Sequence, residues 1–90
     1  MVSEDKQLEK FDYSYIVKIC KLPIITIYKS PKDYEGKYVA RLFDILPSAK
    51  PLKYIVIRNS LECIRECIPL NMTNLGRFEK DDKCIVESYI

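Results

Sequence analysis

Two charged residues stand inside stretches whose alternation is typical of half-buried strands. Arg41 and Glu87 share alternate positions with hydrophobic neighbours: Val39, Phe43 and Ile45 for the first, Ile85 and Tyr89 for the second. A charge that faces a protein interior is costly unless it is paired, so one interpretation is a structural Arg41–Glu87 pair across strands. The other makes Arg41 an anchor for a carboxylate or phosphate, since guanidinium binds such groups with two parallel hydrogen bonds. A single arginine without converging donors favours the structural pair.

A second group of candidates lies in the short loop before Gly36. Asp33 suits a turn by binding nearby backbone groups, and Tyr34 can fold back onto a sheet. An exposed aromatic residue on a rigid loop is also a common way to build a binding surface. We therefore take Asp33, Tyr34 and Arg41 as a hypothetical binding surface and predict no catalytic residues.

The cysteines offer the remaining reactive chemistry: Cys20, Cys63, Cys67 and Cys84. Only Cys63 and Cys67 are close in the sequence, and they lie on a predicted helix, whereas structural zinc sites use paired cysteines on tight turns. A four-cysteine zinc site is thus an alternative that the spacing disfavours. The favoured interpretation is reduced thiols that pack as small hydrophobic groups. We predict no metal and no cofactor.

Missing residue types exclude several classes of enzyme. The chain has no histidine, which rules out Ser-His and Cys-His nucleophiles as well as histidine metal ligands. Its two glycines, Gly36 and Gly76, cannot form the glycine-rich loops of nucleotide enzymes. The enzymatic alternative is a small-ligand or hydrolytic site built from Arg41, Asp33 and Glu87. It requires those three side chains to meet in one cleft.

Composition describes a folded protein without a strong electrostatic preference. Hydrophobic residues make up 48% and charged residues 31% of the 90 positions, and the net charge of +2 comes from scattered groups. Seven tyrosines and 15 lysines and arginines leave single-stranded nucleic-acid binding as an alternative. Tyrosine, however, is also favoured in strands. We find no secretory signal and no membrane span, so we expect a cytoplasmic location and no membrane partner.

Three strands are predicted to position the candidate residues. They cover residues 24–29, 37–45 and 53–58. Residues 30–36 form a hairpin loop between the first two strands, with Pro31 setting the turn and Gly36 able to adopt positive φ. The connection LPSAKPL that follows contains two prolines, which we expect to interrupt the ladder of hydrogen bonds.

A helix and a final strand complete the predicted order. The helix begins after Asn59, which can cap it with Glu62 as a capping-box partner, and ends before Pro69. Residues 84–90 read as the last strand. Residues 13–20 favour a strand by alternation, although spacings of three and four leave a helix capped by Ser3 open.

These elements predict the α+β class. One helix would pack on one face of a small, mainly antiparallel sheet of four to five strands, in the order strand, strand, strand, helix, strand, with an extra N-terminal strand or helix as an option. The length predicts a single domain over residues 1–90, with a charged N-terminal segment at 1–12 and a folded core at 13–90.

The stretches YKSPKDYEGKYVARLFD, SLECIRECIP and CIVESYI together resemble a set of small bacterial proteins with no known activity. That set has a P-x-D-Y loop, a glycine, a V-x-R-x-aromatic strand and a final I-V-E-x-aromatic strand. The matching residues are Pro31, Asp33, Tyr34, Gly36, Val39, Arg41, Phe43, Glu87 and Tyr89. The connection from Leu70 to Lys83 departs from the pattern of the set. The resemblance implies a fold and leaves function open.

The sequence therefore favours a small non-catalytic binding module. Its partner would be another protein or a second copy of the chain joined through an edge strand. A compact phage-type inhibitor of a host enzyme has the same features. Heavy use of Lys, Ile and Tyr suggests a bacterial or phage origin.

Overall fold

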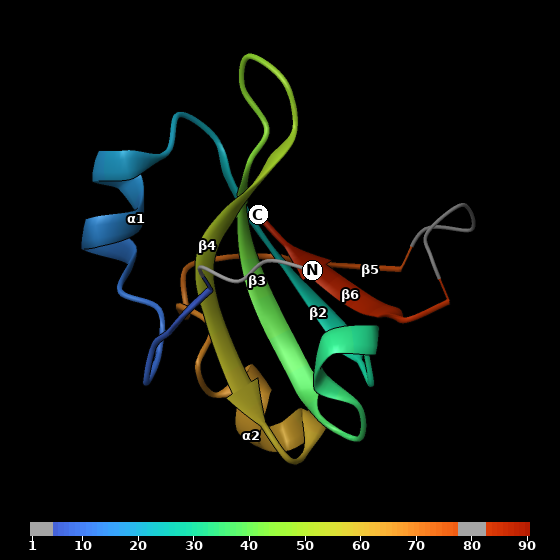
Figure 1. The fold of residues 1–90 in the computed structure, drawn as a ribbon. Helices are drawn as coiled ribbons and strands as arrows, with labels where there is room; N and C mark the ends of the chain where they lie inside the picture. The colour runs from blue at the N-terminus through green and yellow to red at the C-terminus, as the bar shows by residue number, and fades with distance from the viewer. Residues whose placement is uncertain (1–4, 78–82) are drawn as a thin grey trace.

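A computed structural model of the chain describes residues 5–77 and 83–90 (Figure 1). Within these residues the protein has a six-stranded mixed sheet and two α-helices. The predicted α+β class is confirmed, but the sheet has six strands rather than four to five and includes one parallel pair, and the second helix is the N-terminal one that the sequence left as an option. The extra strands are short segments at the two edges of the sheet.

The strands are β1 (Lys6–Gln7), β2 (Pro23–Lys29), β3 (Tyr38–Asp44), β4 (Lys50–Arg58), β5 (Asn74–Gly76) and β6 (Ile85–Tyr89). The helices are α1 (Tyr13–Ile19), the short 3-10 helix η1 (Lys32–Tyr34) and α2 (Leu61–Arg65). The strands lie in the order β1-β4-β3-β2-β6-β5. Strands β1 and β4 are parallel, and all other neighbours are antiparallel. The last strand, β6, lies beside β2.

One face of the sheet carries the hydrophobic core. Ile25 and Ile27 of β2, Ala40 and Leu42 of β3 and Val56 of β4 are each at most 1% exposed. Both α-helices add buried side chains to the same cluster: Ile16 from α1 and Ile64 from α2. Since residues two apart in a strand point to the same side, the helices cover only one face of the sheet.

The segment from Tyr13 to Ile19 is a helix, so the preferred strand was wrong. The Asp12 side chain accepts a hydrogen bond of 3.0 Å from the backbone N–H of Ser14, which caps the helix at its first turn. Ile16 is buried, whereas Val17 is 46% exposed. The alternative cap, Ser3, lies outside the described residues.

The predicted hairpin between residues 29 and 38 is present. Ser30 (φ 51°) and Gly36 (φ 78°) both take positive φ, and the Ser30 hydroxyl accepts the Gly36 N–H at 2.9 Å. Strand β4, however, begins at Lys50, so Pro51 lies in the ladder opposite Phe43. It is tolerated there because β1 pairs with β4 only further along, so the outer side of β4 has no described partner strand at Pro51.

The second helix is shorter than predicted and starts one residue later. Ser60, not Asn59, is the cap, and its hydroxyl accepts the Cys63 N–H at 3.2 Å. The helix ends at Arg65, ahead of Pro69. Strands β1 and β5 were not predicted, because segments of two or three residues carry no measurable periodicity.

Candidate functional site

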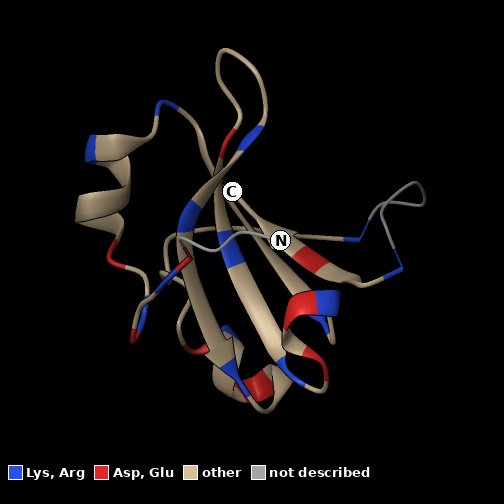
Figure 2. Cartoon of the chain, in the orientation of Figure 1, with Lys and Arg blue, Asp and Glu red and all other residues tan. Residues whose placement is uncertain are grey.

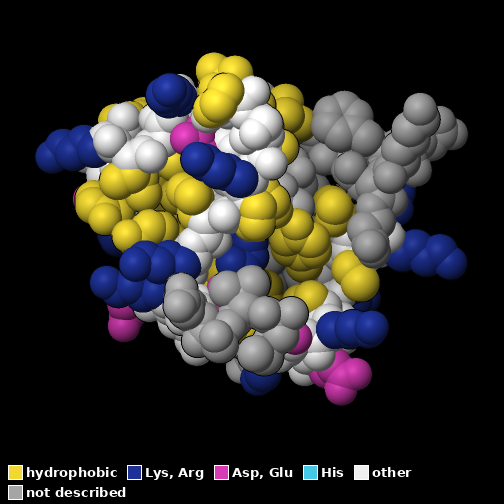
Figure 3. Space-filling model, turned by 45° about the horizontal axis from the view of Figure 1, so that its top comes forward, with side chains coloured by type: hydrophobic (Ala, Val, Ile, Leu, Met, Phe, Trp, Pro, Cys, Tyr) yellow, Lys and Arg dark blue, Asp and Glu magenta, His cyan; other side chains and the backbone are white. Residues whose placement is uncertain are grey.

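The sheet has one face that neither α1 nor α2 covers, which we call the open face. Ile24, Tyr28 and Phe43 point to this side, because their neighbours Ile25 and Leu42 point into the core. Ile24 and Phe43 lie directly opposite each other across β2 and β3. Figure 3 shows hydrophobic side chains gathered at the surface on this side of the molecule. The open face therefore presents half-buried apolar side chains to solvent.

A shallow hollow of about 300 Å³ lies on the open face. It is lined by Ile24, Thr26, Tyr28, Phe43, Ile45, Leu75, Ile85 and Ser88. No charged residue is among them, and the Thr26 and Ser88 hydroxyls satisfy each other across β2 and β6 at 3.2 Å. Leu75 is 39% exposed. The hollow is thus an apolar surface whose polar groups already have partners.

An arginine held by a carboxylate stands beside this hollow. Arg41 binds Asp5 with two hydrogen bonds, Nη1 to Oδ1 at 3.0 Å and Nη2 to Oδ2 at 2.8 Å. Its Nη1 also donates to the Leu52 carbonyl at 2.8 Å. The Tyr34 hydroxyl donates to Asp5 Oδ2 at 3.0 Å. The Asp5 carboxylate therefore receives three hydrogen bonds from two side chains, in a position where its own side chain is 5% exposed.

The hydrogen bonds among Asp5, Tyr34 and Arg41 shift the pKa values of the first two residues. The Arg41 hydrogen bonds lower the pKa of Asp5 below its ordinary value. Burial, followed by the hydrogen bond to Asp5, raises the pKa of Tyr34. At neutral pH the cluster holds one cation, one anion and one neutral phenol, and Arg41 and Asp5 compensate each other.

The three residues named from the sequence as a binding surface lie together. Asp33, Tyr34 and Arg41 line a cavity of about 150 Å³ on the open face, with Tyr28, Pro31 and Val39 completing it. Tyr28 lines both this cavity and the apolar hollow, so the two adjoin. Asp5, which lies 36 positions from Arg41, was not predicted from the sequence. An arginine in a half-buried strand needs an anionic partner, and this need was the one signal in the sequence that pointed to such a residue.

The predicted ion pair between Arg41 and Glu87 is wrong. Arg41 lies opposite Thr26 in β2, and Glu87 lies opposite Ile27. These two β2 residues are consecutive, so Arg41 and Glu87 point to opposite faces of the sheet. A bulge in β6 causes the difference, because it shifts the register so that Glu87 no longer shares a face with Ile85.

Glu87 instead forms a buried cluster on the helix side of the sheet. Arg65 of α2 binds it with Nε at 2.9 Å and Nη2 at 2.8 Å, and the Tyr89 hydroxyl donates to Oε2 at 2.5 Å. The Asn74 amide donates to the Tyr89 hydroxyl at 3.4 Å. Hydrogen bonding to Arg65 lowers the pKa of Glu87 to about 2, and burial raises the pKa of Tyr89 to about 12. The cluster joins α2 to β6.

The residues of the enzymatic alternative do not share one site. Asp33 and Arg41 lie on the open face, while Glu87 lies on the other side of the sheet. The convergence that this alternative required is therefore missing.

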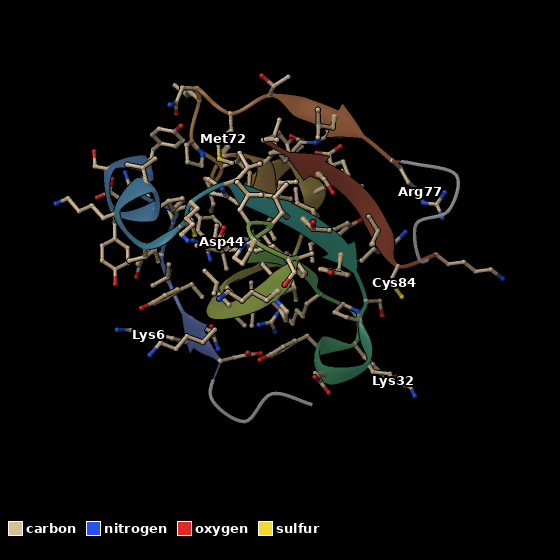
Figure 4. All side chains as sticks on the ribbon, turned by 90° about the horizontal axis from the view of Figure 1, so that it is seen from above. Lys6, Lys32, Asp44, Met72, Arg77 and Cys84 are labelled. Carbon is tan, nitrogen blue, oxygen red and sulfur yellow. The ribbon has the colours of Figure 1, made fainter. Side chains whose placement is uncertain are left out.

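The four cysteines do not form a zinc site. Cys20 follows α1 and Cys67 follows α2, both buried, while Cys63 is exposed and Cys84 lies at the far side of the sheet near Arg77 (Figure 4). Within residues 5–77 and 83–90, no group of three or more cysteine or acidic side chains could hold a metal ion. Burial raises the pKa of Cys20 and of Cys67, which keeps both thiols protonated.

The features expected of a nucleic-acid surface do not gather on one face. Figure 2 shows lysine and arginine spread over the elements with acidic residues among them. The tyrosines are also divided: Tyr28 lies on the open face, Tyr89 is buried on the helix side, and Tyr15 projects from α1. An extended single strand would need both groups along one groove.

Comparisons of this chain with protein-family models, with curated proteins and with solved structures found no match. The resemblance to a set of small bacterial proteins therefore stays a prediction. In the described residues, neither helix has the length and apolar character needed to cross a membrane.

Proposed function

We propose that this protein is a protein-binding module that docks its partner on the open face of the sheet. The observation that carries the proposal is the apolar hollow on the sheet face that neither α1 nor α2 covers. Sheets of this kind usually bury one face and leave polar residues on the other. Here the uncovered side carries Ile24, Phe43 and Ile85 instead, which is typical of an interaction surface.

The shape of the hollow favours a macromolecule over a small ligand. It is broad and shallow, and strands far apart in the sequence contribute to its rim. Small-molecule sites are usually deep enough to bury most of the ligand and place a few polar groups at its floor. The hollow offers no unsatisfied polar group in its lining, so it fits an apolar segment of another protein.

The adjoining cluster supplies the polar margin that such interfaces have. Arg41 and Tyr34 stand next to the hollow, and both residue types are enriched at interface hot spots. Asp5 satisfies both of them in the free protein. A partner would therefore meet an apolar centre with an ordered polar edge.

Face-to-face docking fits the structure better than strand addition. The two outer strands, β1 and β5, have two and three residues, and short edge strands are a common means of avoiding edge pairing. A second copy of the chain is one possible partner class for the open face. An enzyme of a host cell, inhibited on binding, is another.

Site-specific photo-crosslinking tests the proposal. A photoreactive residue at Phe43 should trap a protein partner, either a second copy in the purified sample or a discrete band in extract of the source cell. The same group at Val17, an exposed hydrophobic position on α1, is the matched control and should trap nothing specific. Ile85→Ser should weaken trapping by about tenfold, because it removes an apolar side chain from the lining of the hollow.

Two results would contradict the proposal. Equal crosslinking from Phe43 and Val17 would show that partners contact the open face no more than they contact α1. A band from Phe43 that survives Ile85→Ser unchanged would place the contact away from the hollow.

A further inference from the structure

A second cavity lies on the other side of the sheet, between α1, β1 and the facing parts of β3 and β4. It has a volume of about 260 Å³ and is lined by Lys6, Leu8, Lys10, Phe11, Asp12, Tyr15, Ile16, Leu42 and Tyr54. We call it the α1 cleft. Figure 4 shows β1, with Lys6, on the same side of the molecule as α1 and far from Lys32 and Cys84. The α1 cleft is therefore separate from the open face.

The floor of the α1 cleft is apolar and fixed. Phe11, Ile16 and Leu42 are 5%, 2% and 1% exposed and belong to the core cluster, and Leu8 packs against them. Ligand pockets in proteins commonly start at about 300 Å³. A cleft of this size therefore suits one short chain or one ring.

The rim of the α1 cleft carries two phenols that bind each other. The Tyr15 and Tyr54 hydroxyl oxygens are 3.2 Å apart, and the rings meet edge to face with centroids separated by 5.9 Å. Only one of the two hydroxyl protons is used in this bond, so the other is directed away from the pair. The pair thus offers a donor next to an apolar floor.

Two lysines stand beside the phenols. The Lys53 Nζ lies 5.6 Å from the centre of the Tyr54 ring. The hydrogen bond to Tyr54 raises the pKa of Tyr15, and the charges of Lys6 and Lys53 act in the opposite direction. Lys6 lines the cleft together with Tyr15 and Tyr54, and Lys53 lies over the Tyr54 ring.

Within the described residues, no carboxylate pairs with these lysines. The ion pairs found there join Arg41 to Asp5 and Arg65 to Glu87. Asp12, the one acid in the lining, accepts the Ser14 N–H as the cap of α1. The rim consequently holds more positive than negative charge, directed at a hydrogen-bond donor and an apolar floor.

We propose that the α1 cleft binds a small amphiphilic carboxylate. Its hydrocarbon body would lie on Leu8, Phe11, Ile16 and Leu42. Its carboxylate would accept a hydrogen bond from the phenol pair, between Lys6 and Lys53. The site is independent of the docking function proposed for the open face, and neither requires the other.

Octanoate and 1-octanol are the probes, because they share a chain length and differ in the head group. Titration of the ¹⁵N-labelled full chain, followed by amide chemical shifts, reports both affinity and position. Octanoate should give saturable shifts at Leu8, Ile16 and Tyr54. It should bind at least about tenfold more tightly than 1-octanol, because a charge-assisted hydrogen bond is lost with the alcohol.

Variants separate recognition of the charge from simple apolar binding. Lys6→Gln combined with Lys53→Gln should remove most of the preference for octanoate and leave the weaker binding of 1-octanol unchanged. Lys29→Gln combined with Lys32→Gln makes the same change of net charge in β2 and η1, away from the cleft and its phenol pair, and should have no effect. Leu8→Trp should fill the cleft and abolish binding of both probes.

Three outcomes would overturn the proposal. They are the absence of saturable shifts, equal affinity for octanoate and 1-octanol, and shifts that map to Ile24, Phe43 and Ile85. Spectra of each variant without ligand establish that it is folded. None of these three outcomes affects the crosslinking test of the open face.

Discussion

Three carboxylates of the described residues are withdrawn from solvent, and they are stabilised in two different ways. Asp5 is bound by an arginine and a phenol, and Glu87 by an arginine and a second phenol. Asp44 forms no ion pair within the described residues and instead accepts backbone N–H groups, including that of Leu22 at 3.1 Å. Those backbone bonds lower the pKa of Asp44. Each anion is therefore part of the connection between two segments distant in the sequence.

Glu87→Gln tests the strongest of these connections. Removing the charge leaves Arg65 without its anion, and we expect the free energy of unfolding to fall by about 2 to 3 kcal/mol. The loss should be smaller than for a fully buried pair, because the Arg65 side chain is 47% exposed. Urea unfolding measures it, and Glu62→Gln on the exposed side of α2 is the control. Equal losses in the two variants would contradict the role of the cluster.

The contribution of Glu87 to the free energy of unfolding should depend on pH. The pKa of Glu87 is about 2 in the folded protein against an ordinary 4.5, so the unfolded chain binds the proton more readily. The stabilisation is therefore complete above about pH 4.5 and is lost as pH falls toward 2. The difference in stability between the protein and Glu87→Gln should shrink over that window. A difference that is constant from pH 6 to pH 2.5 would rule out the carboxylate as its source.

At the scale of elements, the sequence predicts those that carry a long periodic pattern. Strands β2 and β3 and the hairpin between them were found, because alternation and a positive-φ glycine agree there. The stretch from Tyr13 to Ile19 fits both a strand and a helix, and Asp12 decides between them by capping. Pro51 was taken as a strand breaker, yet it is harmless on the outer side of β4. Whether such a stretch becomes a helix or a strand, and whether a proline is tolerated in a strand, depends on tertiary contacts. The local sequence pattern carries no information about those contacts.

The candidate site shows the same limit. The cavity around Asp33, Tyr34 and Arg41 was predictable because two of its residues share a short loop and the third lies in the next strand. Asp5 and the bulge in β6 were not, because one is a distant contact and the other is a shift of a single residue. The hydrophobic hollow on the open face was also missed, since alternation does not say which side of a strand the helices cover.

Asp12→Ala tests the role of the Asp12 side chain as the N-terminal cap of α1. Loss of the cap should destabilise the protein by about 1 kcal/mol and speed hydrogen exchange of the α1 amides above that of β2 and β3. Ser14→Ala is the matched control, because Asp12 binds the backbone N–H of that residue and the bond survives the change. If both variants lose the same stability, the carboxylate is not acting as a cap.

The whole molecule is as compact as its length allows. The Cα radius of gyration is 12.1 Å, and a folded chain of this size is expected near 12 Å. The main hydrophobic core lies on the helix side of the sheet, and Val39 and Ile55 are buried on the opposite side, at 2% and 0% exposure. The protein therefore combines a well-packed interior with two hydrophobic surfaces, the open face and the α1 cleft, which are available for binding.

The thiols report on the integrity of this interior. Cys63 is exposed and should react at once with a disulfide reagent such as dithiobis(nitrobenzoate), whereas Cys20 and Cys67 are buried and should react only as the chain unfolds. Mass spectrometry assigns each modified position, including the half-buried Cys84, and Cys63→Ser should remove the part of the fast phase that is assigned to residue 63. Equal rates for Cys20 and Cys63 in the native protein would show that the core opens locally.

The position of β6 also bears on how the protein reaches this state. Thr26 and Ser88, which meet across β2 and β6, are 62 positions apart, and closing so long a loop carries an entropic cost before any contact repays it. We expect folding on the slow side for a chain of this length, in about milliseconds to seconds. Until β6 pairs with β2, one edge of β2 is unpaired. Two chains are therefore most prone to pair wrongly with each other before this last step of folding.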